Sequence, residues 1–593
     1  MRVAPPATWR MAISSMKSAA TICTGRTLAR APSPLAGRRK STRRQTLRYR
    51  SVPFMDLETG PSSPAAGSGG GGDGVVGAVA HPPGYDRRWR VLAVACLSLV
   101  LVVASVSSLN VALPTLARDL DASGRELQWI VDAYALVFAG LLLPFGALGD
   151  RYGRKGALQV GLGLFALCSV ALTFAGTPLQ LIAFRGIMGA AAALIMPATL
   201  SIITNVFPAE ERARAIAIWA GFAGAGGAIG PVVSGLLLER FWWGSIFFIN
   251  LPIIAVALVA GALIMPTSKD TDEQPLDPVG AVLSISGLGL LLYAIIEAPE
   301  LGWLSTATLA GFAGAVVLLA GFVMWERRTA SPMLPMRFFR DRGFTAGSVT
   351  ISLVFFAMFG MFFTITQYLQ FVLGYSALEA AFSLLPASVV LVLLAPRSAV
   401  LAERYGSRRV VGGGLLLVVA GFLVLATLTR DSGYLQLLAG VVLIAAGMAN
   451  TMPPSTTAIM AAMPLGKAGV GSAVNDTTRE LGGAVGIAVL GSVLNSVYRS
   501  RAADLFRDLP SEVADRAQES IAAGIAVAGG GPEALLDDVR DAFNDGIRAA
   551  ILVAAAILVL AAVFVFRFMP DRPGASPGPA SSPRPGPSHG DGG

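Results

Sequence analysis

The stretch QWIVDAYALVFAGLLLPFGAL, residues 128–148, runs directly into the polar loop GDRYGRK, residues 149–155. Its length suits an α-helix that crosses the ~30 Å hydrocarbon core of a bilayer at ~1.5 Å per residue. Asp132 is the one acidic or basic residue within it, and the other charges gather in the loop. An apolar run that ends in a charged loop predicts a membrane-spanning helix that stops at a polar surface.

Apolar runs of this kind recur along the chain. Of its 593 residues, 54% are hydrophobic and only 14% are charged, whereas soluble proteins keep about a quarter of their residues charged. Each strand of a membrane barrel would show only ~10 alternating residues, so the long runs predict an all-α polytopic membrane protein with about fourteen transmembrane helices. The expected spans are residues 91–113, 128–148, 157–176, 180–205, 213–237, 246–266, 279–296, 305–325, 344–372, 378–396, 409–428, 434–462, 470–497 and 546–568.

The net charge of +9 does not indicate nucleic-acid binding. Residues 1–54 hold 12 Lys or Arg and no acid, so the rest of the chain carries 34 basic and 37 acidic residues. No basic binding face is therefore expected. Residues 1–85 are Arg-, Ser-, Gly- and Pro-rich, the tail 571–593 is Pro-, Gly- and Ser-rich, and both are expected to be disordered. We interpret residues 1–54 as a stretch upstream of a true start at Met55, with a transit peptide as the alternative.

The sequence also lacks the motifs of metal sites and enzymes. Cys23, Cys96 and Cys168 show neither a disulfide framework nor metal-ligand spacing. No paired-acid metal motif, nucleophile elbow or nucleotide loop is found. We expect no cofactor, no metal and no enzymatic activity.

The loop charges predict the orientation in the membrane. Fourteen spans place both termini on one side. The short loops on that side hold fifteen Lys and Arg residues and the opposite loops hold four, when the long segment 498–545 is left aside. The positive-inside bias then places both termini in the cytoplasm and the protein in the cell inner membrane. The polar, acidic segment 498–545 is expected to be an external loop with partial helix.

One loop occurs twice in the chain. GALGDRYGRK at residues 146–155, after the second span, is echoed after the tenth by LAERYGSRR at residues 401–409. An acid, an Arg, an aromatic residue, a Gly and basic residues recur at similar spacing on the same side. The echo predicts two related halves, as in transporters built from repeats. The spans within 279–325 are then an insertion.

With these features the chain resembles the major facilitator superfamily, and in particular its fourteen-span drug:proton antiporters, which export quaternary ammonium compounds and antibiotics. The likeness covers about residues 91–497. It implies a major facilitator fold with six-helix halves at 91–266 and 344–568, and we expect a monomer. The motifs that carry it are Gly146 with Asp150-Arg151-x-Gly153-Arg154-Lys155, Arg185 with Gly189, Gly226-x3-Gly230-Pro231-x2-Ser234-Gly235, Asn110-Val-Ala-Leu-Pro114, Phe247-Phe-Ile-Asn250-Leu-Pro252 and Gln367-Tyr-Leu-Gln370.

Two of these motifs have mechanical interpretations. Gly146, Asp150, Arg151, Gly153, Arg154 and Lys155 are interpreted as a conformational latch, whose charges pair with a neighbouring helix end and separate when the halves move. Plain positive-inside anchoring is the alternative. For the fifth span, with Gly226, Gly230, Pro231 and Gly235, the resemblance implies a seal against proton leak. The alternative is close helix packing alone.

Asp132 and Arg185 are the predicted proton-coupling residues. An acid at membrane depth costs ~2.5–3.5 kcal/mol on insertion scales and marks a functional site by default. The two histidines, His81 and His589, lie in the predicted tails, so a carboxyl group must carry the proton. A structural acid near the outer helix end, and a structural ion pair for Arg185, are the alternatives. Many members of this family carry an acidic residue in the first span, five residues before the position of Asn110. This chain has Ser105 at that position.

The predicted substrate pocket is apolar and aromatic, although such a stripe also suits a lipid-facing or core position. Its candidates are Asn110, Tyr134, Phe359, Phe363, Gln367, Tyr368 and Gln370. A second polar group, Asp476, Arg479 and Glu480, is interpreted as a solvated helix start.

The interpretation is an exporter of lipophilic or cationic small molecules that exchanges them for protons by alternating access. A metabolite importer or symporter, a multispan membrane enzyme and a non-transporting sensor are the alternatives.

Overall fold

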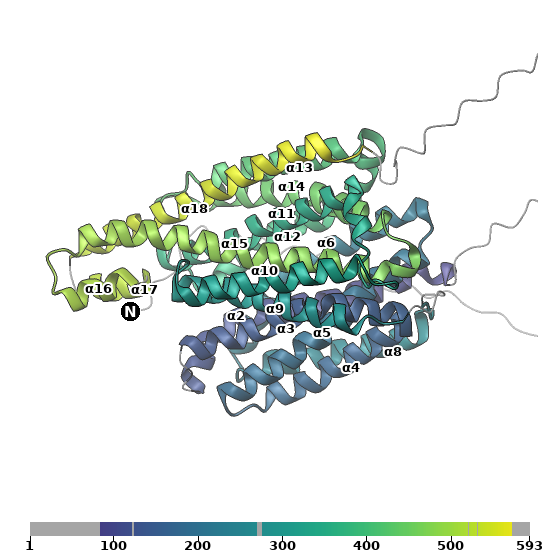
Figure 1. Ribbon diagram of the computed structural model, residues 1–593. Coiled ribbons are helices and arrows are strands. Elements are labelled where there is room, and N and C mark those ends of the chain that lie inside the picture. The colour runs from purple at the N-terminus through teal and green to yellow at the C-terminus, as the bar shows by residue number, and fades with distance from the viewer. Residues whose placement is uncertain are drawn as a thin grey trace, which may run out of the picture. The chain divides into compact units, whose positions relative to one another are not determined.

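The computed structural model describes residues 84–120, 122, 124–269, 275–519, 521–529 and 532–571 (Figure 1). Within them, all regular structure is helical. Fourteen helices of the described part are long and apolar enough to cross a membrane. Each expected span overlaps one of these helices, which confirms the predicted all-α polytopic fold. The predictions for residues 1–83 and 572–593 lie outside the described residues.

The helices are named by their order in the chain. The fourteen long ones are α2 (Arg88–Asp119), α3 (Gly124–Tyr152), α4 (Arg154–Thr173), α5 (Pro178–Val206), α6 (Ala209–Leu238), α8 (Asn250–Ile264), which continues the short α7 (Ser245–Phe248), α9 (Pro278–Leu301), α10 (Thr306–Glu326), α11 (Arg342–Gln367), α12 (Ala377–Tyr405), α13 (Ser407–Leu425), α14 (Tyr434–Ala461), α15 (Ala468–Leu505) and α18 (Glu533–Phe568). Short helices α16 (Ser511–Glu519) and α17 (Ile521–Ala528) lie between the last two, and the 3-10 turn η4 (Leu465–Lys467) precedes α15.

Segment 498–545 is more helical than the sequence predicts. Helix α15 continues to Leu505 and α18 already begins at Glu533, with α16 and α17 between them. The physical reason is a small apolar core among the polar residues. The ring of Tyr498 packs edge-on against Phe543 at 5.7 Å, and its hydroxyl donates to the carbonyl of Ala517 at 3.0 Å.

Glycines on α6 let this helix pack closely against α2 and α12. A Cβ on Gly230 would lie 2.5 Å from the carbonyl oxygen of Ala104 in α2, and one on Gly224 would overlap Leu391 in α12. Ser234, where the related motif usually has Gly, donates to the carbonyl of Ser108 at 2.8 Å. Helices in lipid associate through such close backbone contacts and interhelical hydrogen bonds.

The replacement Gly230→Ala is expected to destabilise the bundle. Its methyl group would collide with the α2 backbone, and overpacking of this kind costs about 1–3 kcal/mol. The matched control is Gly227→Ala, because a Cβ there meets nothing within 4 Å and Ala favours the helix by about 1 kcal/mol over Gly. Thermal unfolding in detergent should show a lower midpoint for the first variant alone. Equal midpoints would contradict the packing assignment.

The two similar loops form similar turns. Gly153 between α3 and α4 has φ of 117°, and Gly406 between α12 and α13 has φ of 86°, a region that favours glycine. The next residue of each loop donates its backbone N–H to a carbonyl just past a later helix: Arg154 to Ser268 at 3.1 Å and Ser407 to Asp571 at 2.8 Å. These matching bonds support the predicted repeat, whose boundaries stay a prediction.

Helices α9 and α10 pack against each other, and α9 contacts both α3 and α15. In Figure 1 this helix pair, the inserted hairpin, lies between α15 and α3. Trp129 of α3 packs against Tyr293 of α9 with ring centroids 6.0 Å apart. Trp303, which follows α9, donates its indole N–H to Ser492 of α15 at 2.9 Å. The inserted hairpin therefore bridges helices that belong to different predicted halves.

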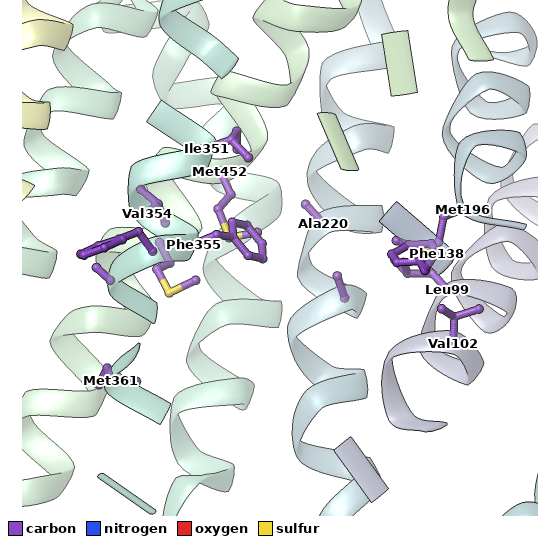
Figure 2. Close-up of a cluster of buried hydrophobic side chains, with 14 of the residues drawn as sticks. Leu99, Val102, Phe138, Met196, Ala220, Ile351, Val354, Phe355, Met361 and Met452 are labelled. Atoms are coloured by element: carbon purple, nitrogen blue, oxygen red, sulfur yellow. The ribbon is translucent and has the colours of Figure 1, made fainter. Parts of the chain in front are cut away.

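Buried apolar side chains fill the space between the helices. In Figure 2, Leu99, Phe138 and Met196 lie together on one side, and Phe355 and Met452 lie together on the other. Ala220 of α6 lies between the two groups in this view. Helix α6 contacts α2 as well as α12 and α14, so it joins the first six long helices to the later ones.

Candidate functional site

The predicted latch lies where α3 ends and α15 begins, on the side of the bundle that carries the turns at Gly153 and Gly406; we call this side the basic face. The backbone N–H groups of Gly469 and Val470 donate to the two carboxylate oxygens of Asp150 at 2.9 and 3.1 Å. Helix α15 receives no side-chain cap from its own N-cap residue, Lys467. Asp150, a residue of a different helix, therefore caps α15 and places a negative charge at its positive end.

Arg154 strengthens the same contact. Its Nε donates to Asp150 at 2.8 Å, and its Nη2 donates to the carbonyl oxygens of Leu465 and Gly466 at 2.6 and 2.9 Å. The side chain is 1% exposed. An ion pair buried in this way is costly to break from one side, because the remaining charge loses its partner. At the basic face, charged groups of α3 and α4 therefore hold the backbone of η4 and α15.

The latch residues Gly146, Arg151 and Lys155 each have different surroundings. Gly146 lets α3 approach α15, since a Cβ there would lie 2.7 Å from the carbonyl oxygen of Gly469. Arg151 is half-buried and lines a cavity, described below, with Asp150. Lys155 donates to the carbonyl of Ala262 in α8 at 2.7 Å. Their function as a latch stays a prediction.

Arg185 lies in a closed pocket between α3 and α5. Its side chain is fully buried, its Nε donates to the carbonyl of Ile130 at 3.2 Å, and its guanidinium lies 4.4 Å from the ring centre of Tyr134. The Tyr134 hydroxyl and the Nη2 of Arg185 are buried without a hydrogen-bond partner. Gly189 makes the close approach possible, because any Cβ there would overlap the Tyr134 carbonyl. The pocket holds one positive charge against an aromatic face.

Asp132 is half-buried in the third turn of α3. It lies about 200° around the helix from both Ile130 and Tyr134, at ~100° per residue, so its side chain leaves α3 away from the Arg185 pocket. The same count places Asp132 on the side of α3 that carries Gly146 and Asp150. At the basic-face end of α3, Gly146 and Asp150 meet α15.

The position of the missing first-span acid is also clear. The Ser105 hydroxyl lies 3.8 Å from the sulfur of Met188, and Nη1 of Arg185 lies 3.7 Å from the same sulfur. Residue 105 therefore adjoins Arg185, and an acid there would be close enough to pair with it. In this chain the groups next to Arg185 at that position, Ser105 and Met188, are neutral.

Asp476, Arg479 and Glu480 are not a solvated helix start, and that prediction is wrong. Helix α15 begins at Ala468, so Asp476 lies about 12 Å along it. Asp476 is 1% exposed and Arg479 is 9% exposed. The signal that could have identified this cluster is a charged residue within an apolar span. The sequence analysis used this signal for Asp132 but not for these residues.

The geometry of this cluster joins several helices. Nη1 of Arg479 lies 3.4 Å from Asp476, and its guanidinium lies 4.6 Å from the ring of Phe355 in α11 and 6.0 Å from Trp219 in α6. One carboxylate oxygen of Asp476 is buried without a hydrogen-bond partner. Glu480 lies close enough to Tyr134 of α3 to act on it electrostatically. Charged groups of α15 therefore face aromatic groups of both predicted halves.

The predicted substrate-pocket residues are dispersed. Asn110 is exposed and Gln370 is half-buried. Phe359 and Phe363 pack on Gly483 and Gly491 of α15. Gln367 donates to the carbonyl of Phe363 at 3.3 Å, and the buried Tyr368 donates its hydroxyl to the carbonyl of Thr429 at 2.8 Å. Tyr134 belongs to the Arg185 pocket. Their contact with a substrate stays a prediction.

Tyr368→Phe distinguishes a structural role from a binding role. Its hydroxyl hydrogen bond to Thr429 contributes about 1 kcal/mol, so we expect a slightly lower unfolding midpoint and an unchanged range of transported compounds. Thermal unfolding and transport of a compound panel check this. A changed range with an unchanged midpoint would place Tyr368 in the substrate pocket.

Comparison with known proteins decides the family. The Major Facilitator Superfamily model matches residues 95–487. The chain belongs to the Major Facilitator Superfamily. The resemblance seen in the sequence is confirmed at this level. As a member of this superfamily the chain is a multi-pass membrane transporter of small molecules and not an enzyme.

Several known proteins are similar in sequence to this chain. The chain is 39% identical to the multidrug efflux pump LfrA of Mycolicibacterium smegmatis, over 79% of this chain and 94% of that protein. It is 37% identical to the methyl viologen resistance protein SmvA of Salmonella typhimurium, over 77% and 93%. It is 34% identical to the tetracenomycin C resistance and export protein of Streptomyces glaucescens, over 72% and 80%.

Solved structures agree on the fold. The human organic anion transporter MFSD10 superposes with a TM-score of 0.57 over 82% of this chain and 100% of its own, at 15% identity. A bacterial homolog of the human lysosomal transporter Spinster, in an inward-facing and unoccupied conformation, gives 0.51 over 82% and 98%, at 18% identity. These likenesses concern the Major Facilitator fold alone.

Proposed function

We propose that the protein is a secondary active exporter that exchanges lipophilic, often cationic, compounds for protons by alternating access. It acts as a monomer in the cell inner membrane with both termini in the cytoplasm, so that the basic face is the cytoplasmic one. The similar proteins named above are efflux, export and resistance proteins, and their names supply the substrate class.

The cluster formed by the buried Asp476 and Arg479 and the half-buried Glu480 carries the proposal. A buried carboxylate oxygen without a partner, as in Asp476, is a position that either a proton or a cationic group can occupy. Aromatic rings of α6 and α11 flank the cluster, and such faces bind lipophilic cations. Competition between proton and cargo for the same carboxyl groups gives exchange, because each occupant displaces the other.

Two further acidic positions complete the proposed cycle. Asp132 lies on the same side of α3 as Asp150, and we assign to Asp132 the proton taken up from the outer side. Asp150 and Arg154 close the cytoplasmic side while this happens. Arg185 holds a fixed positive charge beside Tyr134 and favours the ionised form of any carboxyl that approaches it. Differential affinity of the two states for protons and cargo supplies the coupling.

The proposal is tested by transport in inside-out membrane vesicles. With an acidic interior, a fluorescent lipophilic cation should accumulate in vesicles that contain the protein. A protonophore should abolish the accumulation, because it removes the driving gradient. Vesicles without the protein are the control. Accumulation that survives the protonophore would refute proton exchange, and loss of pre-loaded compound driven by the same gradient would favour a symporter.

A further inference from the structure

The basic-face end of the inserted hairpin brings together two buried carboxyl groups. Asp277 precedes α9 and Glu326 is the last residue of α10; they are 9% and 3% exposed. Asp277 accepts the backbone N–H of Gly280 at 2.8 Å and the indole N–H of Trp325 at 2.8 and 2.9 Å. The proposed export cycle uses neither group.

Glu326 has one satisfied and one unsatisfied oxygen. Its Oε2 accepts the backbone N–H of Leu334 at 3.0 Å, whereas its Oε1 is buried without a hydrogen-bond partner. A Cβ built on Gly280 would lie 2.5 Å from Oδ2 of Asp277 and 2.8 Å from Oε1 of Glu326. These two oxygens therefore lie no more than about 5 Å apart beside Gly280.

Burial and the neighbouring carboxyl group of Asp277 both disfavour the ionised form of Glu326. Lys467 of η4 is a positive group that acts on Glu326 electrostatically, and it donates to the carbonyl of Pro332 at 2.7 Å. Asp150 and Arg151 lie on the side of α3. Asp150 is bound in the latch, and Arg151 lines the cavity. Arg327 and Arg328, after Glu326, are exposed.

One member of the pair, Asp277, lines a cavity at the basic face. A cavity of about 230 Å³ is lined by Asp277, Asp150, Arg151 and Lys467, among others. Its volume exceeds the space that several water molecules need. Its wall is mostly apolar, and the charged side chains of Asp277, Asp150, Arg151 and Lys467 are the partners that it offers to water. The cavity also places the carboxyl pair beside the residues that close the face.

We propose that Asp277 and Glu326 form a proton-binding site in the inserted hairpin, and that the bound proton stabilises the closed basic face. The proton bridges the two oxygens and satisfies Oε1 of Glu326. When it leaves, two negative charges repel and the ends of α9 and α10 separate. Glu326 and Lys467 hold segment 332–334, which then moves away from η4. The carbonyl groups of η4 are those that bind Arg154. Low pH at this face favours the closed state, and high pH favours the open one. The site does not depend on what the protein exports.

Trp325 reports on the site directly, because its indole bonds to Asp277. We expect the emission of the purified full-length protein, minus that of Trp325→Phe, to show a single transition between about pH 5 and pH 9. Glu326→Gln should remove this transition. If Glu326→Gln does not fold, Asp277→Asn provides the same test, since Asn still caps α9. Glu403→Gln, an exposed acid of the second loop, is the matched control and should retain the transition.

A distance measurement tests the link to the closed face. Spin labels at the exposed positions 328 and 465, in a variant with the native cysteines replaced, should move apart as pH rises through the transition. In Glu326→Gln the distance should stay short at every pH. The proposal is overturned if the Trp325 transition is absent from the wild type, if it persists in both Glu326→Gln and Asp277→Asn, or if the distance ignores pH.

Discussion

Replacement of Asp150 by Asn is expected to open the basic face and to lower export at least tenfold while the protein still inserts into the membrane. The variant loses the charge that caps α15 and pairs with Arg154, whose side chain is 1% exposed. Removing one partner of a buried ion pair costs about 3–5 kcal/mol, and about 1.4 kcal/mol corresponds to a tenfold change in an equilibrium. Spin-label distances across α3 and α15, together with vesicle transport, measure both effects.

The matched control is Glu403→Gln in the second loop. Glu403 occupies the corresponding place before its own glycine turn but is exposed. It should leave both the distance and the transport rate unchanged. If Asp150→Asn behaved like this control, with normal membrane insertion, the charged loop would be an anchor that follows the positive-inside bias, and the latch proposal would be wrong.

Asp132→Asn is expected to abolish transport that is driven by a pH gradient. Asparagine keeps the size and polarity of the side chain but cannot release a proton, so the variant should still bind cargo and fail to couple. Binding is measured by quenching of a fluorescent cation, and coupling by accumulation in inside-out vesicles. Asp132→Glu, which restores a carboxyl group, should recover part of the activity. Wild-type accumulation by the Asn variant would remove Asp132 from the cycle and leave Asp476 and Glu480 as carriers.

The sequence predicted the membrane helices because each span must satisfy its own backbone hydrogen bonds within a bilayer of fixed thickness. The pattern around residues 128–155 therefore fixes a helix and its polar end without reference to the rest of the chain. The same local argument predicted the polar loop at residues 149–155, and its echo at residues 401–409 was visible in the sequence as well.

The partners in the site could not be predicted in this way. Asp150 and Gly469 are separated by 319 positions in the chain, and a loop motif does not state which helix end its charge caps. The acids of α15 were assigned to water because they stand near the start of a span, whereas the helix begins earlier and buries them. Asp277 and Glu326 come together only because α9 and α10 pair.

The contacts of Asp150 and Arg154 also determine which substitutions the protein can tolerate during evolution. Asp150 and Arg154 bind main-chain N–H and carbonyl groups of residues 465–470, and every amino acid except proline offers the same two groups. Substitutions at residues 465–470 can therefore accumulate without loosening these main-chain contacts. The exceptions are Gly469, where a side chain would strike Asp150, and Lys467, whose side chain binds the carbonyl of Pro332. Conversely, if Asp150 is replaced, no second substitution of opposite charge within residues 465–470 can restore the contact. The partners of Asp150 there are backbone N–H groups, not side chains.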